Sequence, residues 1–167
     1  LNTEKNISNI NNLIEAINTL DDTKVFFTLA NPDVGGNIIN KIINKYVSQN
    51  KEKSYVFKSL GQKNYLSLLK YVDAVIGNSS SGIIEVPSFK KASINIGDRQ
   101  LGRLQAESII NCHNKKKDIL KAINRVYSKN FQKKLKNTIN PYGDGNTSKK
   151  IVKILKEKNM KNIIIKK

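Results

Sequence analysis

Hydrophobic residues recur at helical spacing near the start of the chain. Within residues 7–20, side chains three and four positions apart are apolar: Ile7, Ile10, Leu13, Ile14, Ile17 and Leu20. Residues with this spacing share one face of a helix, so the pattern predicts an amphipathic helix. The same period returns in residues 37–47 and 60–72, where we expect two more helices.

Short apolar runs separate these helical segments. They have the length of buried strands and lie at residues 25–30, 54–57, 73–77, 92–97 and 108–112. Further helices are expected within 81–89, where Pro87 limits the register or kinks the chain, and twice within 115–137. After the turn cluster at 141–145, Asn146 or Thr147 is expected to cap a last helix at 148–158.

Strands that alternate with helices predict an α/β fold. Parallel strands need a crossover, which is usually a helix, so we expect a Rossmann-like parallel sheet flanked by helices. No repeat or long linker interrupts the pattern. Residues 1–167 are therefore interpreted as a single domain.

The formal net charge of +17 raises nucleic acid as a possible partner. Three of the 30 basic residues are arginines, and the lysines are scattered along the chain. The densest runs, residues 115–117 and 133–134, lack the interleaved aromatic residues that stack on bases. We therefore expect a solvated basic surface. A nucleic-acid-binding module is kept as an alternative, which would show a steep salt dependence of binding.

Cysteine content and hydropathy bear on the compartment. Cys112 is the only cysteine, so no internal disulfide can form, as in proteins of reducing compartments. No apolar stretch reaches the roughly 20 residues of a membrane span, and the N-terminus has no signal-peptide pattern. The chain begins with Leu1 and not with Met. These features predict a protein of a reducing compartment, present here as a fragment, with no membrane partner.

Three loops that follow strands carry polar or charged side chains. They are residues 31–33, 78–82 and 97–99. Ligands of open parallel sheets bind at the carboxyl ends of the strands, so these loops are expected to meet at one edge.

The loop at 78–82 has the composition of a phosphate site. Ser79, Ser80 and Ser81 offer hydroxyl groups, and the first N–H groups of the following helix lack intrahelical partners. No Gly-Lys-Ser/Thr follows, which excludes a Walker loop. Glu85 suits two ribose hydroxyls, and Arg99 could approach the phosphates. Each residue also has a structural alternative. The serines can cap the helix, Glu85 can interact with the helix dipole, and Arg99 can be an ordinary surface charge.

Taken together, these motifs resemble the UDP-N-acetylglucosamine 2-epimerase family, and its hydrolysing branch in particular. The resemblance rests on the run from Gly77 to Gly82, on Glu85, on Asn95-x-Gly97-x-Arg99-Gln100 and on Gly102-Arg103. The later "YGDGN" at 142–146 is similar to the signature before that family's last helix. The resemblance covers roughly residues 5–158.

The resemblance implies a two-domain, GT-B-type enzyme with its active site between the domains, of which this chain would be the C-terminal, UDP-binding half. It implies that Ser79 and Ser80 bind the diphosphate and that Glu85 binds the ribose. Arg99 and Asn31 would face UDP, and the main chain of Leu60 would contact the uracil. No cofactor and no metal are implied. The implied partners are a UDP-sugar, a missing N-terminal domain and, in the full-length enzyme, a further copy in a homo-oligomer.

The implied reaction eliminates UDP, adds water and releases a 2-epimerised N-acetylhexosamine. The substrate could be UDP-N-acetylglucosamine or UDP-diacetylbacillosamine. No residue here matches the family's catalytic groups, and the only histidine, His113, lies outside the signature loops. The family's Gly-x-Pro turn reads Lys90-Lys91-Ala92 in this chain. A UDP-sugar-binding domain of a GT-B glycosyltransferase is the first alternative.

Overall fold

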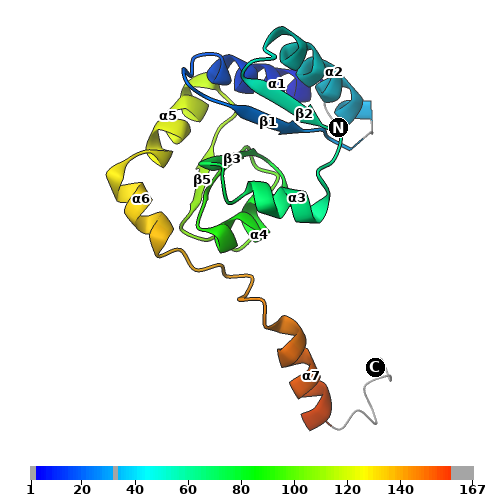
Figure 1. Cartoon of the computed structure of the whole chain (residues 1–167), viewed down its shortest axis with the longest axis vertical. Coiled ribbons are helices and arrows are strands. Elements are labelled where there is room, and N and C mark those ends of the chain that lie inside the picture. The colour runs from blue at the N-terminus through cyan, green and yellow to red at the C-terminus, as the bar shows by residue number, and fades with distance from the viewer. Residues whose placement is uncertain (1–2, 32–33, 159–167) are drawn as a thin grey trace.

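Helices and strands alternate up to residue 96, after which the described residues form one more strand and three helices (Figure 1). The computed structural model describes residues 3–31 and 34–158. The strands are β1 (Val25–Thr28), β2 (Ser54–Phe57), β3 (Ala74–Gly77), β4 (Ala92–Ile96) and β5 (Ile109–Cys112). The helices are α1 (Thr3–Ile17), α2 (Val34–Gln49), α3 (Gly61–Leu68), α4 (Ser80–Ile84), the 3-10 helix η1 (Val86–Phe89), α5 (Lys116–Val126), α6 (Lys129–Lys136) and α7 (Thr147–Glu157). The expected strands and helices are confirmed, with ends that differ by a few residues.

All strand pairs are parallel, but the strands form two ladders where one sheet was expected. β1 pairs with β2, and Val25 lies opposite Ser54. The second ladder has the order β3-β4-β5. The described residues show no ladder between β1 and β3. The expectation of one continuous sheet is therefore wrong in detail, although the parallel α/β class is confirmed.

Helix α1 joins the two ladders through their cores. Ile10 and Ile17 pack with Phe27 of β1 and with α2, whereas Ala16 belongs to the cluster that covers β4 and β5. Leu13 packs against both clusters. One amphipathic helix therefore covers part of each ladder, because its apolar stripe is wide enough to meet both.

Alternation along β4 places helices on both faces of the three-stranded ladder. Ala92 and Ile94 face the cluster of α1 and α5, in which Ile119 is fully buried. Ser93, which points the other way, meets α4 at Gly82. The ladder is thus the middle layer between α5 and α4, with its strand ends free at one edge.

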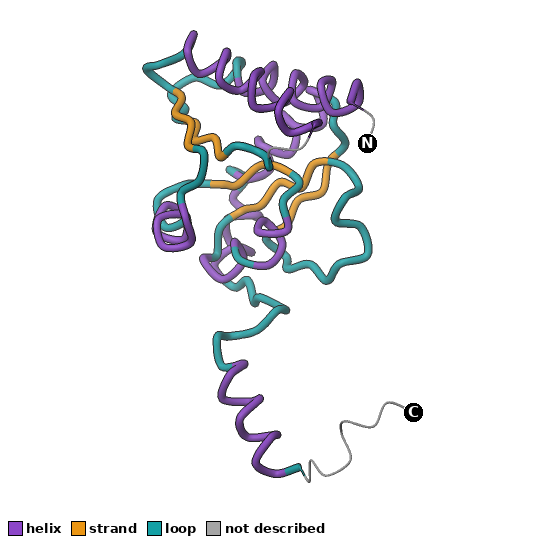
Figure 2. Tube along the Cα trace, turned by 90° about the vertical axis from the view of Figure 1, so that its right-hand side faces the viewer, coloured by secondary structure: helices purple, strands orange, loops and turns teal. Residues whose placement is uncertain are grey.

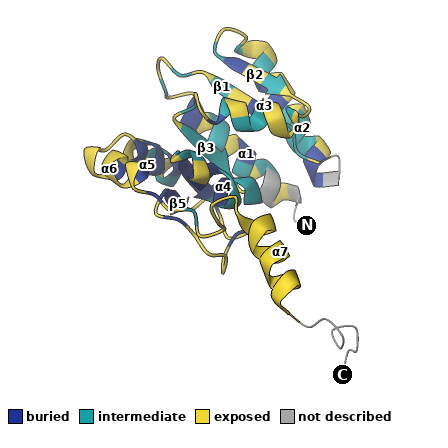
Figure 3. Ribbon diagram, turned by 60° about the horizontal axis from the view of Figure 1, so that its bottom comes forward, coloured by how far each residue is buried: buried dark blue, intermediate teal, exposed yellow. Residues whose placement is uncertain are grey.

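Helix α7 stands away from the rest of the fold (Figures 1, 2 and 3). None of its residues is buried. Its apolar side chains Ile151, Val152, Ile154 and Leu155 recur at helical spacing, and each is about half exposed. The amphipathic pattern that predicted this helix therefore has no partner among the described residues.

A turn at residues 143–146 starts helix α7. Asn146 occupies the N-cap position, as one of the two expected caps, but its side chain makes no capping hydrogen bond. The Asp144 carboxylate instead accepts the Asn146 N–H at 3.0 Å, and the Lys150 ammonium lies 3.5 Å away. The hydrogen bonds from Asn146, with Lys150 adding to them, lower the pKa of Asp144 to about 2.

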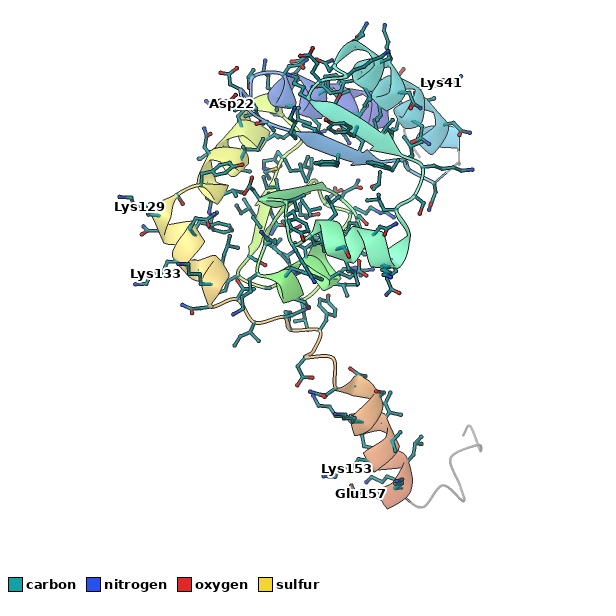
Figure 4. All side chains as sticks on the ribbon, viewed as in Figure 1. Asp22, Lys41, Lys129, Lys133, Lys153 and Glu157 are labelled. Carbon is teal, nitrogen blue, oxygen red and sulfur yellow. The ribbon has the colours of Figure 1, made fainter. Side chains whose placement is uncertain are left out.

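The lysines lie mainly on the solvated surface. Figure 4 shows Lys41, Lys129 and Lys133 pointing away from the body of the protein, and all three are exposed. In the part of the chain that the structure describes, no helix combines the length and the hydropathy that a membrane crossing requires.

Lys90 occupies a backbone conformation that favours glycine, at the position where the family's Gly-x-Pro turn begins. It follows η1 with φ 54° and ψ 36°, in the left-handed region. A residue with a Cβ pays about 1–2 kcal/mol of strain in that region, which a glycine would relieve. The freer unfolded chain of a glycine protein offsets about 0.5–1 kcal/mol of this relief. Lys90→Gly should raise the free energy of unfolding by about 0.5–1 kcal/mol, measured by urea denaturation. Lys91→Gly, at an ordinary φ, is the control and should lower it. If Lys90→Gly lowers the free energy of unfolding, the claim that Lys90 is strained is wrong.

The start of α7 should depend on the charge of Asp144. Because the folded pKa is depressed, the carboxylate stabilises the turn above the ordinary pKa of 3.8, and this contribution is lost as pH falls toward about 2. Asp144→Ala should speed amide hydrogen exchange in α7 at pH 6. The difference from the unmodified chain should vanish near pH 2. Equal exchange in both proteins at pH 6 would show that Asp144 does not hold the helix start.

Candidate functional site

The serine loop, residues 78–82, leads from β3 directly into α4. Ser79 is the N-cap residue, with φ −73° and ψ 145°, and its Oγ accepts the Ser81 N–H at 3.4 Å. The capping alternative is therefore correct for Ser79. Its hydroxyl is nevertheless exposed, and Ser80 in the first helical position is half-buried. Both residues remain accessible to a ligand at the end of β3.

Gly82 lets α4 approach β4 closely. A Cβ at this position would lie 2.6 Å from the Ser93 Oγ, and Ser93 itself is buried. A Cβ here would force the Ser93 hydroxyl to rotate or the helix to shift. The glycine at the end of the serine loop therefore allows this close packing.

Glu85 lies at the end of α4 and not inside a continuing helix. The α-helix has only five residues, and Glu85 is its C-cap, with its N–H donating to the Ser81 carbonyl at 2.9 Å. Pro87 then falls in the 3-10 helix η1, which confirms that it limits the helical register. Glu85 is half-buried, so its carboxylate is still within reach of solvent.

Tyr65 of α3 contacts the serine loop, although the sequence analysis did not identify it. The Ser81 Oγ donates to the Tyr65 hydroxyl at 2.5 Å. Burial raises the pKa of Tyr65 above 10, the hydrogen bond from Ser81 opposes this, and the negative charge of Glu85 adds to it. The hydrogen bond to Ser81, one turn before Glu85, places the Tyr65 hydroxyl near the end of α4. Local spacing marked Tyr65 only as part of an apolar face, so no sequence signal distinguished it.

The loop after β4 places Arg99 beside the serine loop. Gly97 turns the chain with φ 79°, and its N–H donates to the Cys112 carbonyl at 2.9 Å. Arg99 is exposed, whereas Gln100 is buried and its Nε2 donates to the Asn78 carbonyl at 2.7 Å. The structure therefore brings the Arg99 loop and the serine loop together, as their position after neighbouring parallel strands predicted.

Asn31 and Leu60 lie on segments of the other ladder. Asn40 of α2 holds the backbone of Ala30 through two hydrogen bonds of 2.9 and 3.0 Å, which fixes the chain before Asn31. Asn31 is exposed, and no hydrogen bond of the described residues joins it to the serine loop. Pro32 and Asp33 fall outside the described residues. Leu60 is the half-buried N-cap residue of α3, the helix that carries Tyr65. The roles of Asn31 and Leu60 stay predictions.

The segment before the "YGDGN" turn is attached to the same region. The Asn140 Nδ2 donates to the Ile84 carbonyl at 2.8 Å and to the Ser88 Oγ at 2.7 Å. The turn therefore starts beside the end of α4. The sequence identified the turn as a signature but gave no indication of this contact.

The arrangement suits a polyanionic ligand with hydroxyl groups. Serine hydroxyls and the first N–H groups of α4 are hydrogen-bond donors, Arg99 is a cation, and Glu85 is an acceptor. A five-residue helix has few aligned peptide dipoles, so donors matter more here than the helix dipole. Among the residues that the structure describes, no group of three His, Cys, Asp or Glu side chains could hold a metal. His113 follows β5 and is exposed.

Comparison with known proteins gives the family of the chain. A family model described as UDP-N-acetylglucosamine 2-epimerase matches residues 1–156. A Campylobacter jejuni protein named GDP/UDP-N,N'-diacetylbacillosamine 2-epimerase (hydrolyzing) is 42% identical over 132 residues, which are 79% of this chain and 34% of that protein. The Escherichia coli polysialic acid biosynthesis protein P7 is 37% identical over 158 residues, which are 94% of this chain and 40% of that protein.

Solved structures show the same fold. A UDP-N-acetylglucosamine 2-epimerase from Listeria monocytogenes, described as putative, superimposes with a TM-score of 0.74 at 17% identity, over 93% of this chain and 42% of the other. The Neisseria meningitidis enzyme bound to UDP-GlcNAc superimposes with a TM-score of 0.69 at 19% identity, over 90% of this chain and 41% of the other. The chain thus spans less than half of these relatives, with a Rossmann-like fold of the GT-B type. From the family match and the signature loops, we conclude that it belongs to the UDP-N-acetylglucosamine 2-epimerase family.

Proposed function

We propose that this chain is the C-terminal, UDP-binding half of a hydrolysing UDP-N-acetylhexosamine 2-epimerase. The observation that carries the proposal is the joining of two signature loops at one strand edge. The serine loop and the Arg99 loop lie on neighbouring parallel strands and are linked by the Gln100–Asn78 hydrogen bond. Hydrogen-bond donors and the segment that carries Arg99 therefore lie at the same strand edge, which supports a diphosphate site there.

The diphosphate would be held by Ser79, Ser80 and the first N–H groups of α4. Phosphate oxygens accept several hydrogen bonds, and bonds to a charged acceptor are stronger than neutral ones. Ser79 already accepts one N–H with its oxygen, which leaves its hydroxyl proton free to donate to a phosphate. Arg99 is exposed beside the loop and would balance the negative charge.

The nucleoside would lie toward Glu85 and α3. The two oxygens of a carboxylate can accept hydrogen bonds from both ribose hydroxyls. A phosphate-binding loop presents mainly donors and cannot do this. Tyr65 of α3 bonds to Ser81, one turn before Glu85, so the end of α4 lies against the helix that begins at Leu60. This contact supports the assignment of ribose to Glu85 and of the base to the start of α3.

In the reaction, the C1–O bond to UDP breaks while a base takes the C2 proton. Water then adds to the glycal-like intermediate, and the free 2-epimerised sugar is released together with UDP. The residues of this chain would bind the leaving diphosphate and stabilise its growing charge. No residue of this chain is assigned as the base that takes the C2 proton, because Glu85 is assigned to the ribose and the resemblance implies catalytic groups in the other domain.

Helix α7 supports the proposal that a further domain completes the enzyme. The family match extends to residue 156, so α7 belongs to the common domain and is no unrelated tail. Its apolar stripe, residues 151–155, is nevertheless about half exposed. Such a stripe normally packs against another element, which the portion of the relatives outside the matched region would supply.

Relatives indicate the sugar class and the pathway. One relative is named for GDP/UDP-N,N'-diacetylbacillosamine, and a solved neighbour is bound to UDP-GlcNAc. We therefore assign a UDP-linked N-acetylated hexosamine as the substrate. The product would enter the synthesis of sialic-acid-like sugars in the cytoplasm, and the name of the polysialic acid relative supports this pathway.

The isolated chain should bind UDP more tightly than uridine, because the serine loop addresses phosphate. Ser80→Ala should weaken UDP binding about 10–100-fold and leave uridine nearly unchanged, since a hydrogen bond to a charged group is worth about 1.5–3 kcal/mol. Glu85→Gln should weaken both ligands, because both carry the ribose. Isothermal titration calorimetry measures the affinities of the unmodified chain and of each variant for both ligands.

Ser67→Ala is the matched control for this experiment. Ser67 is an exposed serine on α3 whose Oγ donates to the Lys63 carbonyl, so its loss should change neither affinity. Equal affinity of the unmodified chain for UDP and uridine would overturn the phosphate site. A Glu85→Gln protein that loses only UDP would overturn the ribose assignment.

The isolated chain should release no free sugar from a UDP-sugar, because elimination needs a base for the C2 proton. Adding the remaining domain of a relative, in one chain or as a second polypeptide, should restore turnover. Arg99→Ala should then lower turnover about 10–100-fold through the lost charge stabilisation. UDP release, with the product sugar identified by NMR, is the measurement.

His113→Ala is the control for the position of the catalytic groups. His113 is exposed beyond β5, so the variant should keep the restored turnover. Turnover by the isolated chain that disappears in His113→Ala would show that the catalytic base lies within these 167 residues.

A further inference from the structure

Gln100 is buried between two exposed neighbours. Its side chain is 2% exposed, whereas Leu101 is 85% exposed and Arg99 is exposed. A buried amide loses its hydrogen bonds to water, which is costly unless a partner replaces them. The Nε2 atom has such a partner in the Asn78 carbonyl, at 2.7 Å.

This hydrogen bond joins the two signature loops beyond the end of their ladder. The β3–β4 pairing ends where Gly77 lies opposite Asn95, and the chains then diverge into the serine loop and the Arg99 loop. Among the described residues, no other hydrogen bond connects residues 78–82 with residues 97–103. The acceptor, Asn78, directly precedes Ser79. Holding its carbonyl in place therefore fixes the start of the segment that carries the serine hydroxyls.

We infer that Gln100 is a positioning residue for diphosphate binding, which it supports without touching the ligand. It holds the serine loop at a fixed distance from Arg99, so that donors on one loop and the cation on the other reach the same diphosphate. This inference rests on the proposed UDP site and adds the residue that fixes its geometry. Neither Ser79 nor Ser80 is otherwise tied to the Arg99 loop by a hydrogen bond among the described residues.

The side-chain chemistry explains why a glutamine is needed. The carbonyl of Asn78 requires a donor, and the amide nitrogen provides one. The Gln100 Oε1 is buried and has no hydrogen-bond partner within the described part of the chain. The amide is therefore kept in place by one bond at its nitrogen. A methionine would fill the space without donating, and a charged carboxylate would repel the carbonyl oxygen.

Gln100→Met is the first test, in the complete 167-residue chain. It should weaken UDP binding about three- to tenfold, the range of one net hydrogen bond, and change uridine binding less than about twofold. Gln105→Met is the matched control. Gln105 lies in the same connection but is exposed and bonds with Asn111, so both affinities should stay unchanged.

Gln100→Glu gives a second readout that a purely structural role would not produce. Burial raises the pKa of an introduced carboxyl group, and its protonated form can donate to the Asn78 carbonyl. UDP affinity relative to the unmodified chain should therefore be lowest at pH 8 and recover toward pH 5. The native charged groups of the two loops and of α4 are Asp98, Arg99, Arg103 and Glu85. They are present in both proteins, so the ratio of the two affinities removes their effect.

The outcomes separate this inference from the proposed function. If the unmodified chain fails to prefer UDP over uridine, the UDP site and the role of Gln100 both fall. If that preference holds but Gln100→Met keeps it, or Gln100→Glu shows no recovery at low pH, only the role of Gln100 is overturned. If neither variant folds, the Gln100 side-chain amide NMR signal of the unmodified chain decides. It should shift with UDP and not with uridine, and an unchanged signal would overturn the inference.

Discussion

The candidate site depends on the parallel pairing of β3 with β4. Because both strands point the same way, the segments that leave them emerge at the same edge, one with three serines and one with Arg99. An antiparallel neighbour would have sent one of these loops to the opposite edge. The close approach of Gly82 to Ser93 and the bond from Gln100 to Asn78 then adjust the two loops to each other. The geometry of the site thus follows from one strand pair and two local contacts.

The packing around this pair is uneven. β4 is covered on one face by α1 and α5 and on the other by α4, which makes it the most enclosed strand. β1 and β2 have one covered face. On the other face the rings of Phe26 and Tyr55 stack with their centroids 5.2 Å apart, and both residues remain about 40% exposed. α7 has no covered face. The well-packed part therefore carries the serine and Arg99 loops, whereas β1, β2 and α7 carry exposed apolar side chains.

The residues of the site differ in how they are supported. Ser79 caps a helix and presents its hydroxyl at the same time, because one oxygen both accepts an N–H and carries a proton. Glu85 ends α4, whose Ser81 bonds to Tyr65 of α3. Arg99 is exposed on the neighbouring loop. Hydrogen-bond donors on one loop and an exposed cation on the other suit a polyanionic ligand.

The sequence by itself determined the element types, the parallel α/β class and the family, because helical and strand periods are local and the signature loops are contiguous. It also placed Ser79, Ser80, Glu85 and Arg99 after the correct strands. Only the tertiary structure decided that the sheet divides into two ladders and that Glu85 ends a five-residue helix. It alone revealed the contacts of Tyr65, Gln100 and Asn140, which join residues 16, 22 and 56 positions apart. No local pattern encodes such contacts, because they depend on how the chain returns to the same place after folding.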